Sequence, residues 1–100
     1  MGYSIRVEGN TMWLTLSNNI ALQEARNLRE TIPPFINENI NELHIDMSGV
    51  DFIDSGGLGT LVKLFKQIQQ QGGKMVMTNV KDTVKEILKV TKLTDVFEIR

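Results

Sequence analysis

A serine within a glycine-rich segment has the clearest chemical capacity in this chain. Ser55 follows Asp54 and precedes Gly56-Gly57-Leu58-Gly59, and an apolar run beginning at Leu43 leads up to it. Aspartate and serine are both favoured at helix N-caps, and glycine lets the backbone turn sharply without a steric penalty. A hydroxyl placed there is exposed at the positive end of a helix dipole, where a phosphate group is stabilised. The residue types therefore indicate either an ordinary helix N-cap or a switch that accepts a phosphate, rather than a catalyst.

Three other chemistries are open to side chains near this serine. A nucleophilic serine needs a base, but the sole histidine, His44, falls within the preceding apolar run, and the segment lacks the Gly-x-Ser-x-Gly pattern. Asp46, Asp51 and Asp54 are possible metal ligands, although their positions at a strand end and a turn favour capping and turn hydrogen bonds. The glycines resemble a phosphate-binding loop without its Gly-Lys-Ser/Thr ending. We expect no catalytic residue, no metal and no cofactor, and nucleotide binding or hydrolysis remains an alternative.

Composition limits the chain to a single small domain. The 100 residues are 41% hydrophobic, which is enough for one core. The 11 basic and 12 acidic residues are spread along the chain, giving a net charge of −1 and no patch for nucleic acid or a membrane surface. The chain has no cysteine, its charged and alternating start is no signal peptide, and no apolar run approaches the roughly 20 residues that span a bilayer. We therefore expect one domain over residues 1–100, located in the cytoplasm.

The serine segment must be positioned by a strand before it and a helix after it. Alternating apolar residues predict strands over residues 3–8 and 11–16, with Gly9-Asn10 as the turn between them. A third strand over residues 42–47 leads to the serine. Two further strands are predicted over residues 74–78 and 96–99.

Amphipathic spacing predicts three helices between these strands. The first covers residues 21–32 with a stripe of Leu22, Ala25, Leu28, Arg29 and Ile32. Pro33-Pro34 then interrupts it, and a short helical segment carrying Phe35 and Ile36 follows. The second helix follows the serine and stops at Gly72-Gly73, with an apolar stripe of Leu58, Leu61, Val62, Phe65 and Ile68. A third helix is predicted over residues 82–91.

Together these elements predict an α/β fold. Strands alternating with helices after an opening hairpin indicate a mixed sheet of four to five strands, covered by three to four helices. Right-handed crossovers would place Ser55 at the carboxyl end of the third strand. That edge usually carries the function of an open α/β sheet.

Residues 42–59, with the sequence ELHIDMSGVDFIDSGGLG, resemble the core motif of STAS domains, in particular the bacterial anti-sigma factor antagonists. Gly72-Gly73-Lys74 and Leu93–Phe97 also match that pattern, and the element order extends the resemblance over essentially the whole chain. The resemblance implies a single STAS-like domain without enzymatic activity. It implies that Ser55 is phosphorylated by a GHKL-type partner that is both a serine kinase and an anti-sigma factor. The unphosphorylated antagonist would bind this kinase and free the sigma factor, and a serine phosphatase would reverse the phosphorylation.

Two departures from the family pattern concern the same region. Many members carry a second Ser or Thr directly after the phosphoacceptor, whereas this chain has Gly56, so Ser55 is the only hydroxyl in the turn. Many members also have an aspartate in the loop after the second strand, where this chain reads Ser17-Asn18-Asn19. Asn18 or Asn19 can supply hydrogen bonds there but no charge.

We expect the partner to dock on the serine segment and on the exposed edge of the helix that follows it. Leu64 lies at the margin of the apolar stripe and is expected to add an apolar contact. The predicted partner-binding residues are Asn18, Asn19, Asp54, Ser55, Gly56, Gly57, Leu58, Gly59, Thr60, Lys63 and Leu64. The alternative within the same family is a STAS scaffold or a transporter-associated subunit without a phosphoswitch.

Overall fold

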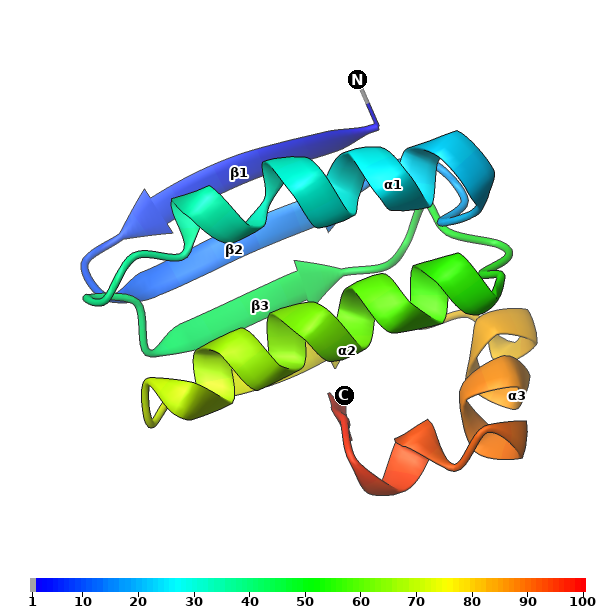
Figure 1. Ribbon diagram of the computed structural model, residues 1–100. Helices are drawn as coiled ribbons and strands as arrows, with labels where there is room; N and C mark the ends of the chain where they lie inside the picture. Colours follow the sequence, from blue (N-terminus) through cyan, green and yellow to red (C-terminus); the bar gives the residue numbers. More distant parts are fainter. Residues whose placement is uncertain (1) are drawn as a thin grey trace.

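A computed structural model describes residues 2–100 of the protein (Figure 1). The strands are β1 (Tyr3–Glu8), β2 (Thr11–Leu16), β3 (Glu42–Asp46), β4 (Lys74–Thr78) and β5 (Glu98–Ile99). The helices are α1 (Leu22–Thr31), α2 (Ser55–Gln70) and α3 (Asp82–Val90), with short 3₁₀ turns η1 (Pro33–Phe35) and η2 (Leu93–Asp95). The expected α/β fold with a mixed sheet is confirmed.

The strands lie in the sheet in the same order as in the sequence. The order is β1-β2-β3-β4-β5, with β1 antiparallel to β2 and each later neighbour parallel. Parallel neighbours place their carboxyl ends at one edge of the sheet. The loops that follow β2, β3 and β4 therefore meet at that edge, and Ser55 comes directly after the second of them, at the start of α2.

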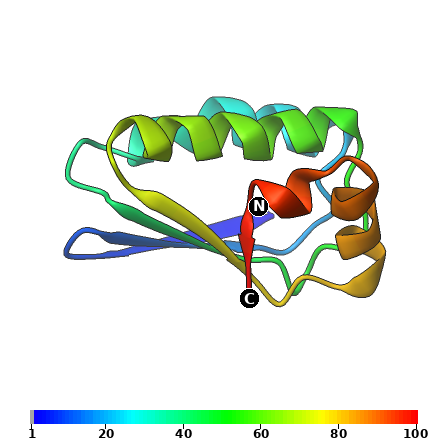
Figure 2. The same ribbon diagram turned by 90° about the horizontal axis from the view of Figure 1, so that it is seen from below.

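The helices cover one face of the sheet (Figure 2). α1 and α2 lie side by side on this face, while α3 lies beside the carboxyl edge. The core fills the space between the sheet and the two helices, because alternate residues of each strand point toward them. Its strand contribution is Met12, Leu14, Leu16, Leu43, Ile45, Met75 and Met77, and its helix contribution is Ala25, Leu28, Leu61, Leu64 and Ile68. Within residues 2–100, no helix is long and apolar enough to cross a membrane.

The other face of the sheet carries a stack of polar and aromatic side chains. The rings of Trp13 and His44 stack with their centroids 4.4 Å apart, and the Arg6 guanidinium lies 5.3 Å from the Trp13 ring centroid. His44 Nε2 lies 3.0 Å from Glu42 Oε1, and this hydrogen bond is the main cause that lowers the pKa of Glu42. His44 is thus a packing residue on the face away from the helices.

Two sequence predictions are wrong in detail. Leu22 was expected in the buried stripe of the first helix, but its side chain is 84% exposed because the helix begins at this residue in a left-handed conformation. The last strand was expected over residues 96–99, but only Glu98 and Ile99 pair with β4. Phe97 instead closes the turn after η2 and packs edge-on against Phe65, with ring centroids 5.6 Å apart.

Candidate functional site

The loops after β2 and β3 run side by side at the carboxyl edge and bring the predicted site residues together. Ile20 and Ile53 form a parallel bridge beyond the ends of their strands. The Ile20 N–H donates to the Phe52 carbonyl at 3.1 Å, and the Asp54 N–H donates to the Ile20 carbonyl at 3.2 Å. The segment before Ser55 is therefore an ordered extension of the sheet.

Asp54 holds the first turns of two helices with one carboxylate. It is the N-cap of α2, and its Oδ1 accepts a hydrogen bond of 2.8 Å from the Gly57 N–H. Its Oδ2 accepts a hydrogen bond of 3.0 Å from the Leu22 N–H at the start of α1. These backbone donors, Leu22 first and Gly57 second, lower the pKa of Asp54 because they stabilise its charged form. The Asp54 carboxylate is thus occupied within the chain.

Leu22 combines backbone strain with exposure beside this carboxylate. Its φ angle is +52°, in the left-handed region that costs a non-glycine residue about 1–3 kcal/mol. The hydrogen bond to Asp54 helps to hold this conformation, which turns the leucine side chain into solvent. Phe52, two residues before Asp54, is 50% exposed. The sequence did not indicate that either side chain is exposed, yet both present apolar surface next to the serine segment.

Ser55 is the first residue of α2, as expected, and its side chain is exposed. The next residue, Gly56, has no side chain to compete with it. Thr60 carries the following hydroxyl in the helix, but this group is buried, 3.0 Å from the Ala25 carbonyl and 2.9 Å from the Gly56 carbonyl. An enzyme that approaches the N-terminus of α2 therefore meets the hydroxyl of Ser55 and not that of Thr60.

Gly57 fixes how α2 lies on the rest of the molecule. A Cβ atom at this position would lie 2.1 Å from the Ile20 carbonyl oxygen and 2.6 Å from Ile53 Cγ2. Only glycine allows the helix to approach the β2–α1 loop so closely. A Cβ atom at Gly59 would meet nothing within 4 Å, so the opposite side of this turn is open.

Three of the predicted partner-binding residues are buried and are therefore wrong as contact residues. Thr60 and Leu64 are 1% and 2% exposed, and Gly57 is also buried. Because α2 approaches the β2–α1 loop at Gly57, the side of the helix that carries Gly57 faces the core. The buried residues of α2 are therefore Gly57, Thr60, Leu61, Leu64 and Ile68. Leu64 therefore cannot make the apolar contact with a partner that the sequence suggested.

The remaining predicted residues are accessible. Ser55, Gly59, Lys63 and Asn18 are exposed, and Gly56 and Leu58 are partly buried. A shallow groove of about 460 Å³ runs along the outer side of α2, lined by Gly59, Val62, Lys63, Lys66, Gln67 and Gln70. Lys63 lies across from α1, with its Nζ 3.5 Å from the Arg29 carbonyl.

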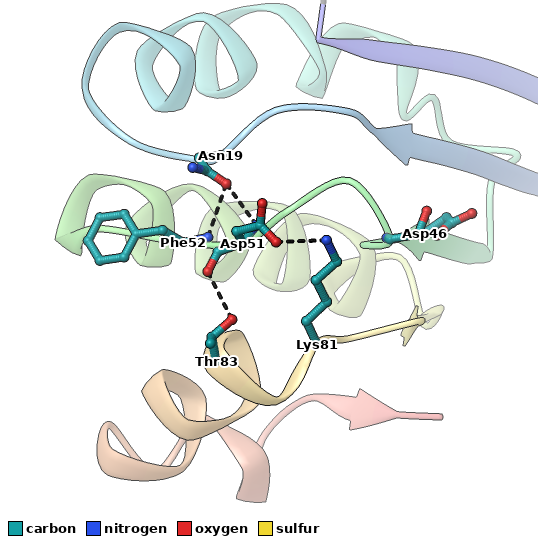
Figure 3. Close-up of polar contacts among 7 residues, drawn as sticks. Asn19, Asp46, Asp51, Phe52, Lys81 and Thr83 are labelled. Carbon is teal, nitrogen blue, oxygen red and sulfur yellow. Dashed lines mark hydrogen bonds and ion pairs between the residues drawn. The ribbon is translucent and has the colours of Figure 1, made fainter.

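The β3–α2 loop is held by hydrogen bonds to Asn19 on one side and by contacts with Lys81 and Thr83, at the start of α3, on the other (Figure 3). Asn19 Oδ1 accepts hydrogen bonds from the N–H groups of Asp51 at 2.7 Å and Phe52 at 3.1 Å. Lys81 Nζ lies 2.7 Å from Asp51 Oδ1, and Thr83 Oγ1 donates to the Asp51 carbonyl at 3.0 Å. The amide of Asn19 thus supplies hydrogen bonds without a charge in this loop, and it directs them to the backbone.

The three aspartates near the serine have separate partners. Asp46 Oδ1 accepts hydrogen bonds from the Ser48 N–H at 2.9 Å and from Asn79 Nδ2 at 3.1 Å, and the Ser48 N–H is the main cause that lowers its pKa. Asp51 pairs with Lys81, and Asp54 bonds the two helix N-termini. Their contacts correspond to the capping and turn bonds that the sequence favoured over metal ligation.

The sheet order, the two parallel helices on one face and the serine at the start of α2 define a STAS domain. Residues 3–100 match the family model described as STAS domain, and the chain belongs to this family. It is similar to the anti-sigma-B factor antagonist of Bacillus subtilis (strain 168), with 27% identity over 95 residues, covering 95% of this chain and 86% of that protein.

Solved structures show the same fold. An anti-sigma-factor antagonist (STAS) domain protein from Planctomyces limnophilus superposes with a TM-score of 0.85 at 20% identity, covering 98% of this chain and 87% of that one. The anti-sigma factor antagonist SpoIIAA of Bacillus is similar in its unphosphorylated form, with a TM-score of 0.75, 13% identity and coverage of 98% and 86%. Its phosphorylated form also gives a TM-score of 0.75, with 14% identity and coverage of 98% and 90%.

Proposed function

We propose that this chain is an anti-sigma factor antagonist that switches partners by phosphorylation of Ser55. In its unphosphorylated form it binds an anti-sigma factor serine kinase of the GHKL class, which frees the sigma factor for transcription. Phosphorylation of Ser55 ends this binding, and a serine phosphatase restores it. The observation that carries the proposal is the exposed Ser55 side chain at the first position of α2, directly after a loop that Asn19 and Asp54 hold through hydrogen bonds. The names of the similar proteins support the same role.

A phosphate on Ser55 is compatible with the fold. Phosphoserine carries about −1.5 to −2 charges at neutral pH. Such an anion at a helix N-terminus is stabilised by the helix dipole. The neighbouring Asp54 carboxylate already accepts hydrogen bonds from the Leu22 and Gly57 N–H groups, and we expect it to keep this position when Ser55 carries a phosphate. The switch therefore acts on the partner rather than by unfolding the antagonist.

The surface around Ser55 explains why a phosphate would disrupt binding. We define the docking surface as Leu22, Phe52, Ser55, Gly59 and Lys63. Its two large apolar side chains are Leu22, at the start of α1 and hydrogen-bonded to Asp54, and Phe52, in the loop before the serine, so we expect a partner that covers them to cover the Ser55 hydroxyl as well. A phosphate there would place an unpaired dianion among desolvated contacts, which is strongly unfavourable. A thousandfold loss of affinity corresponds to only about 4 kcal/mol.

The decisive experiment measures binding of the purified chain to the GHKL-class anti-sigma kinase of the same organism by calorimetry. We expect Ser55→Ala to bind about as tightly as the unmodified chain and Ser55→Asp to bind at least tenfold more weakly. The matched control is Gln69→Glu, which adds one negative charge to an exposed position at the far end of the same helix. If Ser55→Asp and Gln69→Glu bind equally well, the charge at Ser55 does not control the partner.

A second measurement asks whether the modification occurs. Intact-mass analysis and peptide mapping of the protein from its own host, with and without phosphatase treatment, should show a reversible phosphate on Ser55. A chain that never carries phosphate across growth and stress conditions would instead favour the scaffold or transporter-associated alternative.

A further inference from the structure

The free edge of β1 has the features of a pairing surface. β1 pairs with β2 over all six of its residues, without a bulge. The Ser17 N–H donates to the Gly2 carbonyl at 2.7 Å, which marks Gly2 and Ser17 as a hydrogen-bonded pair. Because such pairs alternate along an antiparallel ladder, Ser4, Arg6 and Glu8 direct their backbone groups to β2. Tyr3, Ile5 and Val7 direct theirs outward, where no other segment of residues 2–100 pairs with them.

This edge lacks most of the features that protect edge strands from pairing. It has no proline and no lysine, and its two charged residues, Arg6 and Glu8, form an ion pair with each other on the helix-free face. The opposite edge of the sheet differs, because β5 has only two residues and ends beside the charged Arg100. Only β1 thus presents a long, regular edge.

Side chains on the helix side of the β1 edge are also incompletely covered. Val7 is 49% exposed although it points to the same face as the core. A groove of about 660 Å³ lies between the start of β1 and α1, lined by Gly2, Tyr3, Asn18, Glu24, Asn27 and Thr31. An additional strand along this edge would cover Val7 and close one side of the groove.

We propose that β1 pairs with β1 of a second copy of this chain, antiparallel, about a twofold axis at Ile5. In this register the outward backbone groups of Tyr3, Ile5 and Val7 meet those of Val7, Ile5 and Tyr3 of the second copy. The same groups that lack a partner in one chain are thereby satisfied by their equivalents. The side chain of Val7 packs beside Tyr3 of the second copy, at the open groove.

Charge disfavours the register centred on Arg6, and the hairpin turn disfavours the register centred on Val7. Centring the axis on Arg6 would place two arginines directly opposite each other, which is unfavourable. Centring it on Val7 would draw Gly9 into the ladder, although Gly9 turns away with a φ of +60°. With Ile5 at the axis, Arg6 lies opposite Ser4 of the second copy, and no like charges are directly opposed.

The resulting dimer has a continuous ten-stranded sheet with α1 and α2 of both copies on one face (Figure 2). α1 of each copy flanks the axis, and α2 lies farther from it (Figure 1). Both Ser55 residues remain accessible, so this association is independent of the proposed partner switch. A strand-to-strand contact of this kind is small compared with the roughly 1,200–2,000 Å² of stable interfaces, so we expect weak association.

Sedimentation velocity and amide hydrogen exchange test the pairing with the purified chain alone. The weight-average mass should rise from 11.3 kDa toward twice that value as the concentration increases from roughly 10 µM to 1 mM. Over the same range the amides of Ile5 and Val7 should become protected from exchange, while those of β5 should not change. A chain that stays monomeric at the highest concentration, or an Ile5 amide that never gains protection, would overturn the proposal.

Val7→Pro provides the matched perturbation. It removes an N–H that points away from β2, so the fold should persist, as judged by circular dichroism, while dimerisation is lost. The control Val7→Ala shortens the side chain but keeps the N–H, and it should still dimerise. Self-association that survives in Val7→Pro with unchanged affinity would place the interface elsewhere and refute pairing through β1.

Discussion

Replacing Gly57 by alanine tests the closest approach between α2 and the β2–α1 loop. The new methyl group would lie 2.1 Å from the Ile20 carbonyl oxygen, a backbone atom that cannot rotate away. Overpacking of this kind costs about 1–3 kcal/mol, and the rigid neighbour points to the upper end. Alanine offsets roughly 1 kcal/mol through its higher helix propensity. We therefore expect Gly57→Ala to lower the free energy of unfolding by about 2 kcal/mol.

Gly59→Ala is the matched control, with the same substitution in the same helix two residues later. Its methyl group would meet no atom within 4 Å, so only the gain in helix propensity remains. We expect this variant to be more stable by about 0.8–1 kcal/mol. For a domain of this size the two effects correspond to a fall in Tm of roughly 8–16 °C and a rise of roughly 4–8 °C.

Thermal unfolding followed by circular dichroism, with urea titration for the free energies, separates the two variants. The reasoning requires opposite signs. If Gly57→Ala is as stable as the unmodified chain, the helix does not approach Ile20 as described, and the burial of Thr60 and Leu64 loses its explanation.

Three further predictions concern the polar contacts of the site. The folded-state pKa values of Asp46 and Asp54 are lowered, so the ionised carboxylates stabilise the fold above the unfolded pKa of about 4, and this stabilisation is lost as the pH falls below it. We therefore expect the midpoint of urea unfolding to decline between about pH 5 and pH 2. A midpoint that stays constant over this range would contradict the prediction. Asn19→Ala removes the acceptor of two loop amides and should lower the unfolding free energy by about 1–2 kcal/mol, whereas Asn18→Ala should change it by less than about 0.5 kcal/mol in the same urea titration. Lys81→Met breaks the exposed ion pair with Asp51 and should lower the free energy of unfolding by no more than about 1 kcal/mol in the same urea titration. A larger loss would contradict the assignment of this pair as a weak surface interaction.

The position of Ser55 could be predicted because every signal for it is local. An apolar strand, two good capping residues and a helix stripe follow one another within residues 43–70, and the structure places the serine at the first turn of α2. The alternation in residues 11–16 likewise matches the structure, in which Met12, Leu14 and Leu16 are buried and Trp13 between them is exposed. Such patterns depend on neighbouring residues, and here the tertiary contacts left both the start of α2 and the two faces of β2 as the patterns predict.

The rotation of α2 could not be predicted because it depends on a distant residue. Leu58 and Val62 suit a buried stripe as well as Thr60 and Leu64 do, and only the contact between Gly57 and Ile20 decides between them. The exposure of Leu22 has a similar origin, since Asp54, far along the chain, helps to hold its backbone in the left-handed conformation. Gly57, three residues after the N-cap Asp54, was a usable signal for a close approach, but the sequence does not say which atom the glycine approaches.

The sequential strand order has a consequence for how the protein is made. Each strand of the sheet lies beside the strand that precedes it in the sequence, so every new strand finds its neighbour already synthesised. The β1–β2 hairpin can form as it leaves the ribosome, and β3 with its helix can add to it before β5 exists. At about 5–20 residues per second, translation leaves seconds between these steps, which is ample for small domains that fold in milliseconds. The sheet can therefore assemble in the order β1 to β5 during translation, before β5 has been synthesised.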